Sequence, residues 1–266
     1  MFHVSSVRVY PANFCKNSIA SINTEFFSRY LHLYEIKFSI NSFGTRNKLF
    51  QKRPSYLMYR TLKSESYSLS NIIIPDEQPL AWNIEPQRSA LLVHDMQRYF
   101  VDALPCEPVD TVIHSISLIL KWARINEIPV FYSAQPGGMT PEQRGLLNDL
   151  WGPGMRTTED ERKIITELTP SPGDTVLTKW RYSAFYRSPL AEMLKNDQRD
   201  SLIITGIYAS VGISATAIDA FTQDIKPFVT ADGIADFSLA GHQQAINYLA
   251  DNCAKIISTD GVVNNV

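Results

Sequence analysis

Charged and polar side chains follow several short apolar segments of the sequence, at the points where buried strands would end. Asp95, Gln135 and Lys179 each come after such a segment, and Gly212 closes a glycine-containing turn that follows another. In an open parallel sheet, ligands bind beyond the carboxyl ends of the strands, where these residues would meet. An acid and a base at such an edge suit proton transfer to a bound molecule. The sequence therefore predicts an acid–base site at this edge.

The elements that would hold these residues alternate between strand and helix. Residues 89–94 form the continuous apolar run expected of a strand buried on both faces, and residues 109–126 carry apolar side chains at helical spacing. Alternation of this kind is typical of a parallel sheet with helices on both faces. We predict an α/β domain of three layers (α/β/α) around a doubly wound, mostly parallel six-stranded sheet. Its further strands are expected at 128–133, 175–178, 201–205, 227–230 and 255–258, and its further helices at 188–195, 213–223 and 239–250.

Composition and charge exclude several classes of function. The 266-residue chain is 44% hydrophobic and 20% charged, with a formal net charge of −2. A net charge this small gives no reason to expect nucleic acid as a partner. No apolar run reaches the roughly 18 residues of a membrane span, so we do not expect a membrane as a partner either. The three cysteines (Cys15, Cys106 and Cys253) are far apart and form no C-x-x-C pair. The sequence therefore predicts no zinc site and favours a cytoplasmic protein.

The first 57 residues differ in character from the rest. They hold eight Lys or Arg against two Glu, a net charge of +6, whereas the remainder carries −8. Because they show no sustained strand or helix period, we assign residues 58–266 to the domain and residues 1–57 to an N-terminal extension. A basic, Ser-rich segment that is poor in acids fits a targeting segment. The interpretation that we favour is a translation start at Met58.

Four segments of the chain carry a specific resemblance. They read LLVHDMQRYF at 91–100, LLNDLWGPGM at 146–155, TKWRYSAF at 178–185 and ITGIYASVG at 204–212. In this order they resemble the isochorismatase family, and the resemblance runs from about Trp82 to the C-terminus. It implies an α/β hydrolase that cleaves the vinyl ether of an isochorismate-type substrate and releases pyruvate.

The larger superfamily includes cysteine hydrolases such as nicotinamidases, which combine an Asp, a Lys and a nucleophilic Cys. By this resemblance Asp95 and Lys179 match the first two, and Gly212 stands at the cysteine position. Without a thiol there, acyl-enzyme chemistry has no nucleophile. Isochorismatases usually carry His two residues before this glycine, where the chain has Ser210. The replacement reduces activity if that His is catalytic and changes little if it supports the turn, which is the interpretation we favour.

Hydrolysis of a vinyl ether requires a proton on the terminal methylene carbon, after which water attacks the oxocarbenium ion. The resemblance implies Asp95 as the acid, with Lys179 as the second catalytic residue and no covalent intermediate. An ordinary Asp pKa of about 3.9 is too low for an acid near pH 7. A protonated Lys179 would lower this pKa further, whereas desolvation by apolar neighbours would raise it. The neighbours expected to do so are Leu92, Phe100 and Trp151.

The remaining candidates are expected to bind a dicarboxylate substrate. The guanidinium of Arg144 suits bidentate contact with a carboxylate, and the ammonium of Lys179 suits a second one. We hypothesise that substrate binding neutralises these cations and lets Asp95 hold its proton. Neither a metal nor a cofactor is expected, and the resemblance implies a homodimer. The predicted substrate-binding residues are Gln135, Arg144, Trp151, Tyr182, Phe100, Tyr208 and Gly212.

Two related substrates fit the resemblance. Phenazine pathways use 2-amino-2-deoxyisochorismate, and catechol-siderophore pathways use isochorismate with enzymes that often carry an aryl carrier domain. The segment VHDMQRYF at 93–100 looks closer to the phenazine hydrolases, and the chain shows no carrier domain, so we favour the amino substrate. The alternatives are an isochorismate-specific siderophore enzyme and a non-catalytic family member that binds a small acid. An amidase is disfavoured by Gly212.

Overall fold

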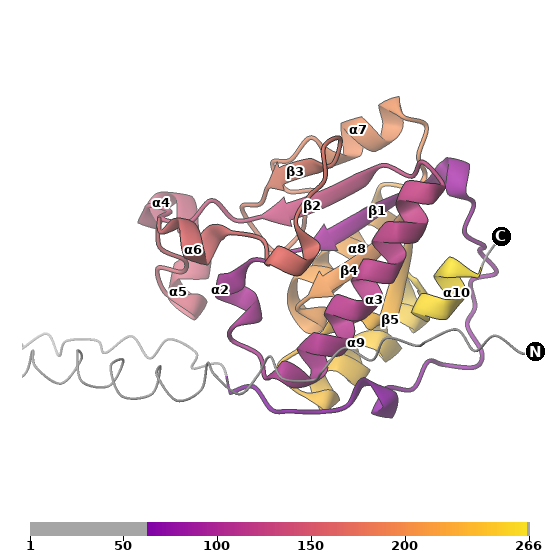
Figure 1. Cartoon of the computed structure of the whole chain (residues 1–266), viewed down its shortest axis with the longest axis horizontal. Coiled ribbons are helices and arrows are strands. Elements are labelled where there is room, and N and C mark those ends of the chain that lie inside the picture. Colours follow the sequence, from indigo (N-terminus) through magenta and orange to yellow (C-terminus); the bar gives the residue numbers. More distant parts are fainter. Residues whose placement is uncertain (1–62, 265–266) are drawn as a thin grey trace, which may run out of the picture. The chain divides into compact units, whose positions relative to one another are not determined.

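A computed structural model of the protein describes residues 63–264 as a six-stranded sheet covered by helices (Figure 1). The strands lie in the order β3-β2-β1-β4-β5-β6, and every neighbouring pair is parallel. The prediction of a doubly wound, mostly parallel six-stranded sheet is confirmed. The proposed boundary at residue 58 and the interpretation of residues 1–57 fall outside the described residues. The strands are β1 (Ser89–His94), β2 (Val130–Ala134), β3 (Thr175–Thr178), β4 (Ser201–Ile207), β5 (Lys226–Ala235) and β6 (Lys255–Ile257).

Helices cover both faces of this sheet. On one face lie α3 (Cys106–Ile125) and α10 (Thr259–Val263), and on the other lie α7 (Leu190–Asn196), α8 (Ser214–Thr222) and α9 (Leu239–Asn252). Short elements gather beyond the carboxyl ends of the strands, at the left of Figure 1. These are α2 (Arg98–Val101), α4 (Pro141–Arg144), α5 (Leu147–Trp151) and α6 (Glu159–Arg162). The 3₁₀ turns are η1 (Leu69–Asn71), η2 (Pro86–Arg88) and η3 (Thr166–Leu168), and η4 (Ala209–Ile213) is a π-helical turn.

β1 lies at the centre of the sheet because its side chains are apolar on both faces. All six of its residues are buried. Leu91 and Val93 pack in the core beneath α3, whereas Ala90 and Leu92 pack in the core beneath α8 and α9. Since successive side chains of a strand point to opposite faces, this run satisfies both layers at once.

Local sequence signals fix the starts of several helices. The Ser238 hydroxyl accepts a hydrogen bond from the Gly241 amide at the start of α9, and Ser258 does the same for Gly261 at the start of α10. At α4, Thr140 and Gln143 form a reciprocal capping box. Such caps satisfy amide groups that have no partner within the helix.

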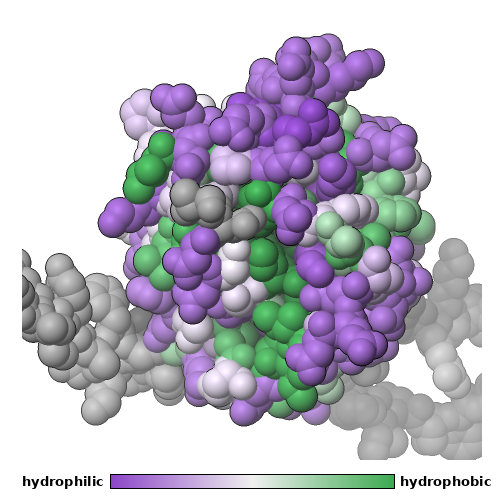
Figure 2. Space-filling view, turned by 90° about the vertical axis from the view of Figure 1, so that its right-hand side faces the viewer, coloured by the Kyte–Doolittle hydropathy of each residue, from purple (hydrophilic) through white to green (hydrophobic). Residues whose placement is uncertain are grey.

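The predicted elements of the sheet and its covering helices are present with ends that differ by a few residues. β5 is the largest difference: it runs to Ala235, whereas the apolar pattern predicted an end at 230. Within residues 63–264, no helix combines the length and the apolarity that a membrane span requires. Figure 2 shows the right-hand side of Figure 1, away from α4–α6, where apolar residues form a central band between hydrophilic ones.

Candidate active site

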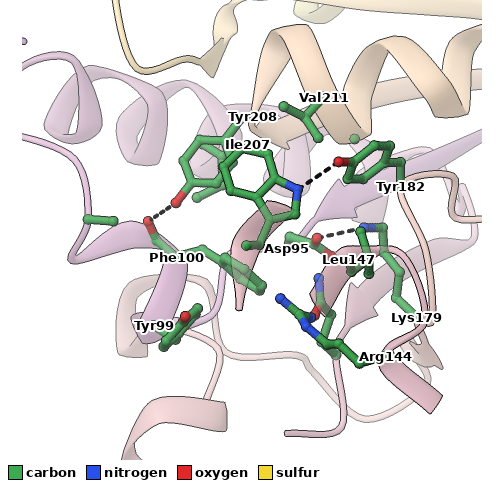
Figure 3. A pocket seen from close by; sticks show the side chains of 14 residues that line it. Asp95, Tyr99, Phe100, Arg144, Leu147, Lys179, Tyr182, Ile207, Tyr208 and Val211 are labelled. Carbon is green, nitrogen blue, oxygen red and sulfur yellow. Dashed lines mark hydrogen bonds and ion pairs between the residues drawn. The ribbon is translucent and has the colours of Figure 1, made fainter. Parts of the chain in front are cut away.

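The winding of the sheet reverses between β1 and β4, because β2 and β3 lie on one side of this pair and β5 and β6 on the other. At such a switch point the loops leaving the two strands diverge and open a crevice at the carboxyl edge. A cavity of about 330 Å³ at this edge is lined by residues that follow β1, β2, β3 and β4 (Figure 3). All nine predicted site residues line it: Asp95, Phe100, Gln135, Arg144, Trp151, Lys179, Tyr182, Tyr208 and Gly212.

Asp95 and Lys179 form a buried ion pair inside this cavity. Asp95 directly follows β1 with φ of 52°, a left-handed conformation that Asp tolerates better than most residues. Its Oδ2 accepts a hydrogen bond from Lys179 Nζ at 2.8 Å, and its Oδ1 accepts one from Ser133 Oγ at 2.7 Å. The two charged residues are 6% and 3% exposed, so water screens their interaction little. The acid and the base predicted from the sequence are therefore in direct contact.

The charge state of Asp95 follows from these partners. Burial raises its pKa, but the positive charge of Lys179, the adjacent His94 and the hydrogen bonds from Lys179 and Ser133 outweigh burial and hold the pKa below its ordinary value. Asp95 is therefore a carboxylate at neutral pH in the unliganded site.

The apolar neighbours proposed for Asp95 are only partly in place. Phe100 and Trp151 line the cavity, but Leu92 lies in the core beneath α8 and α9 and does not line it. Alternate residues of β1 point to opposite faces, and Leu92 faces the helices α8 and α9. Desolvation of Asp95 by Leu92 therefore stays a prediction. In the free protein, burial is the largest single effect on the pKa of Asp95, and the ammonium of Lys179 is the largest of the effects that oppose it.

Arg144 contributes a second buried cation, from the end of α4. Its Nε donates to the Gly152 carbonyl at 3.0 Å, and its Nη1 donates to Gln135 Oε1 at 3.1 Å. Both acceptors are neutral, and no ion pair joins Arg144 to a carboxylate within residues 63–264. Burial lowers its pKa from a value so high that the side chain stays protonated. A buried guanidinium with neutral partners is suited to bind an anion.

Aromatic side chains close the other walls of the cavity. Trp151 Nε1 donates to the Tyr182 hydroxyl at 2.6 Å, which joins α5 to the segment after β3. The Tyr208 hydroxyl donates to the Phe100 carbonyl at 2.7 Å (Figure 3), and the Tyr208 ring packs on Phe237 with 4.1 Å between centroids. The Tyr208 donor is therefore already used by the protein, and its contribution to the site is the ring.

The turn after β4 brings Gly212 to the cavity. Its backbone amides are largely occupied: Ser210 N donates to Asp236 Oδ2 at 2.6 Å, and the amides of Val211 and Ile213 both donate to the Tyr208 carbonyl. The side chain of Ser210 is exposed and does not line the cavity. Ser210 therefore stabilises the turn through the hydrogen bond of its backbone amide and not through its side chain. This favours the interpretation that position 210 supports the turn.

Several site residues were not predicted from the sequence. Tyr99, Ala103, Leu147, Ile207 and Val211 complete the lining. Gln97 lies beneath it, 1% exposed: its Oε1 accepts from the Gln135 amide at 2.7 Å, and its Nε2 donates to the Gln135 carbonyl at 3.0 Å and the Arg162 carbonyl at 2.8 Å. The sequence feature that could have identified Gln97 is its position two residues after Asp95. Within residues 63–264, no three His, Cys, Asp or Glu side chains cluster as metal ligands would.

The sequence matches a known protein family over most of the described residues. Residues 89–261 match the isochorismatase domain. A probable isochorismatase from Pseudomonas chlororaphis is 52% identical over 182 residues, which cover 68% of this chain and 88% of that protein. The phenazine biosynthesis protein PhzD of Pseudomonas fluorescens is 51% identical over the same length and coverage. Enterobactin synthase component B of Escherichia coli is 45% identical over 200 residues, 74% of this chain and 70% of that protein.

Solved structures show the same fold at lower identity. A cysteine hydrolase from Pseudomonas syringae pv. phaseolicola aligns with a TM-score of 0.64 and 22% identity, covering 72% of this chain and 98% of that one. At this identity the likeness shows the fold alone, and the sequence match is the more specific finding. Together they confirm the predicted hydrolase class: the chain belongs to the isochorismatase family.

Proposed function

We propose that the protein hydrolyses the vinyl ether of an isochorismate-type substrate, 2-amino-2-deoxyisochorismate in preference to isochorismate, and releases pyruvate without a covalent intermediate. One observation carries this proposal. Within residues 63–264, the residues that line the cavity provide one carboxyl, Asp95, and two buried cations, Arg144 and Lys179, with no Cys, Ser or Thr side chain. Such a lining suits proton transfer to a bound anion better than attack by a side-chain nucleophile.

The charges explain how Asp95 comes to act as an acid. Without a ligand, Lys179 and Arg144 outnumber Asp95 by one positive charge, and Asp95 is ionised. A substrate with two carboxylates reverses this excess. Because the site is buried, the added negative charge interacts strongly with Asp95 and raises its pKa, which favours the protonated form.

The reaction then follows from the chemistry of the ether. Asp95 gives its proton to the terminal methylene carbon, and the ether oxygen stabilises the resulting cation. Water adds to the cationic carbon and returns a proton to the Asp95 carboxylate. The hemiketal collapses: the bond between the pyruvyl carbon and the ether oxygen breaks, the ether oxygen stays on the ring, and the proton lost by the hemiketal hydroxyl is transferred to it. Pyruvate and an alcohol then leave. In this sequence Lys179 and Arg144 hold the carboxylates, and the aromatic walls keep bulk water away.

The choice of substrate rests on the relatives. The protein named for phenazine biosynthesis is 51% identical to this chain, against 45% for the enterobactin synthase component. The phenazine relative thus supports the amino substrate, and the siderophore relative supports isochorismate as the second candidate.

The test measures pyruvate from both substrates in parallel, with Asp95→Asn as the matched variant. Asp95→Asn keeps the shape of the side chain and removes the acid, so release should fall by at least about 100-fold. In D₂O the pyruvate methyl should carry one deuterium, and in H₂¹⁸O the alcohol should stay unlabelled. Pyruvate release that persists in Asp95→Asn, or ¹⁸O in the alcohol, would overturn the mechanism. No release from either substrate by folded protein would favour a binding role.

A further inference from the structure

His94 lies directly behind the site without lining the cavity. It is the last residue of β1, fully buried, and paired in the sheet with Ser133 on one side and Gly206 on the other. Its Nδ1 donates to the Ile207 carbonyl at 2.8 Å and lies 3.8 Å from Asp95 Oδ2. The ring lies between Asp95 and the turn after β4.

Two glycines make room for this residue. An added Cβ at Gly206 would lie 2.1 Å from the His94 carbonyl oxygen, and one at Gly212 would lie 2.2 Å from His94 Cε1 and 2.9 Å from Nε2. Contacts this short are not tolerated, so a neighbour would have to move. The imidazole is rigid, enclosed and hydrogen-bonded to Ile207, so it has little freedom to yield.

We propose that His94 is a positioning residue for Asp95, and that its ring is what restricts position 212 to glycine and so keeps a side-chain nucleophile out of the cavity. Positions 94 and 212 act as one unit. A side chain at 212 becomes possible when residue 94 is small, because the volume above the Cα of Gly212 is then free.

The same contacts explain how His94 positions the acid. Asp95 has a left-handed backbone, which persists only where the surroundings hold it. The hydrogen bond from His94 to Ile207 ties the residue before Asp95 to β4. The pKa of His94 is lowered to about 4. Burial is the largest cause and the charge of Lys179 adds to it, whereas Asp95 and the carbonyls of Ile207 and Tyr182 act in the opposite direction. At neutral pH the ring is therefore uncharged and acts by shape and by one hydrogen bond.

The coupling between the two positions is tested with Gly212→Ala, His94→Ala and the double variant, measured by thermal unfolding. In the parent, Gly212→Ala should lower the unfolding temperature by about 5 °C or more, or prevent folding. With His94→Ala, the added methyl fills vacated space, so the same change should raise the unfolding temperature or restore folding. Gly261→Ala on α10 is the control, because its Cβ would lie 2.6 Å from Ile257 Cγ1, remote from His94 in the fold. Gly261→Ala should lower the unfolding temperature equally with and without His94→Ala.

If Gly212→Ala lowers the unfolding temperature equally with and without His94→Ala, the His94 ring is not what restricts position 212 to glycine. This measurement needs no substrate, so it is independent of the proposed function.

The positioning role does rest on that function and is measured by turnover. His94→Ala should lower kcat for pyruvate release at least about 10-fold with KM nearly unchanged, since Arg144 and the aromatic walls remain. His94→Asn, whose amide can donate to Ile207, should recover much of kcat. Equal loss of kcat in both variants, or a loss confined to KM, would exclude positioning through this hydrogen bond.

Discussion

At the scale of single residues, Arg144 is a buried cation whose hydrogen bonds go to neutral acceptors. Replacing it with Gln removes the charge but keeps a polar side chain of similar reach. A charge-assisted hydrogen bond contributes about 1.5–3 kcal/mol, so KM for the substrate should rise about 10- to 100-fold while kcat changes less. Steady-state kinetics of pyruvate release measure this effect. Arg124→Gln, which removes an exposed guanidinium paired with Asp174 at the far end of α3, is the control. A loss in kcat alone would contradict a role in binding.

Lys179 determines the charge of Asp95 in the free protein. In Lys179→Met the opposing ammonium is gone and burial remains, so the pKa of Asp95 should rise above its ordinary value. The ¹³C shift of the Asp95 carboxyl, assigned by comparison with Asp95→Asn, follows this titration without turnover. A midpoint that stays below the ordinary value would show that Ser133 and His94 hold the carboxylate ionised.

The pH profile of turnover tests whether substrate binding protonates Asp95. The acid form is required, so activity should fall as pH rises through the relevant pKa. Since kcat reports the complex and kcat/KM the free protein, the fall in kcat should come at higher pH than the fall in kcat/KM. A loss of activity that begins near pH 4 on the acidic side, with the full rate kept at pH 8, would indicate a different acid.

At the scale of elements, one side-chain hydrogen bond joins α5 to the segment after β3. Trp151→Phe and Tyr182→Phe each remove the bond between Nε1 and the hydroxyl but keep a ring on the cavity wall. Each should raise KM about 3- to 10-fold, and the double variant should be little worse than either single one. Additive losses in this double-mutant cycle would show that the two rings act independently.

The elements also show what a sequence can and cannot predict. β1 and β3 were predicted at their observed bounds. For β1, a continuous apolar run followed by a polar residue marks a short strand buried on both faces. The elements α2, α4, α5 and α6 were not predicted, since four or five residues are too few for a helical period. Asp236 is a site-supporting residue that the sequence did not single out. Its contact with the Ser210 amide depends on a turn 26 residues away, which no local pattern specifies.

At the scale of the whole molecule, two buried histidines should govern stability in mild acid. Burial lowers the pKa of His94 and of His242 to about 4, below the ordinary 6.5. The unfolded chain therefore binds more protons than the folded one between these values. Stability is complete above pH 6.5 and is lost as pH falls toward 4, by up to about 3 kcal/mol for each histidine.

The variant His242→Phe tests this dependence. It removes one of the two titrations, so the decline of unfolding free energy between pH 6.5 and 4 should become clearly shallower. Urea unfolding at a series of pH values gives the slope, and His114→Phe is the matched loss of an exposed imidazole on α3. An unchanged slope in His242→Phe would assign the acid sensitivity to other groups.

Because β3 is an edge strand, Lys179 is held by one of the outermost strands of the sheet. This strand has four residues and forms one of the two outer edges of the sheet described for residues 63–264, and Lys179 follows directly after its end. Outer strands open more often than central ones, and each such opening separates the ammonium from Asp95, which stays anchored to the central strand. Hydrogen exchange at the Lys179 amide, which donates to the Ala134 carbonyl, would therefore report how often the acid is without its counter-ion. The proton affinity of the proposed catalytic centre is thus an average over the fraying of an edge strand.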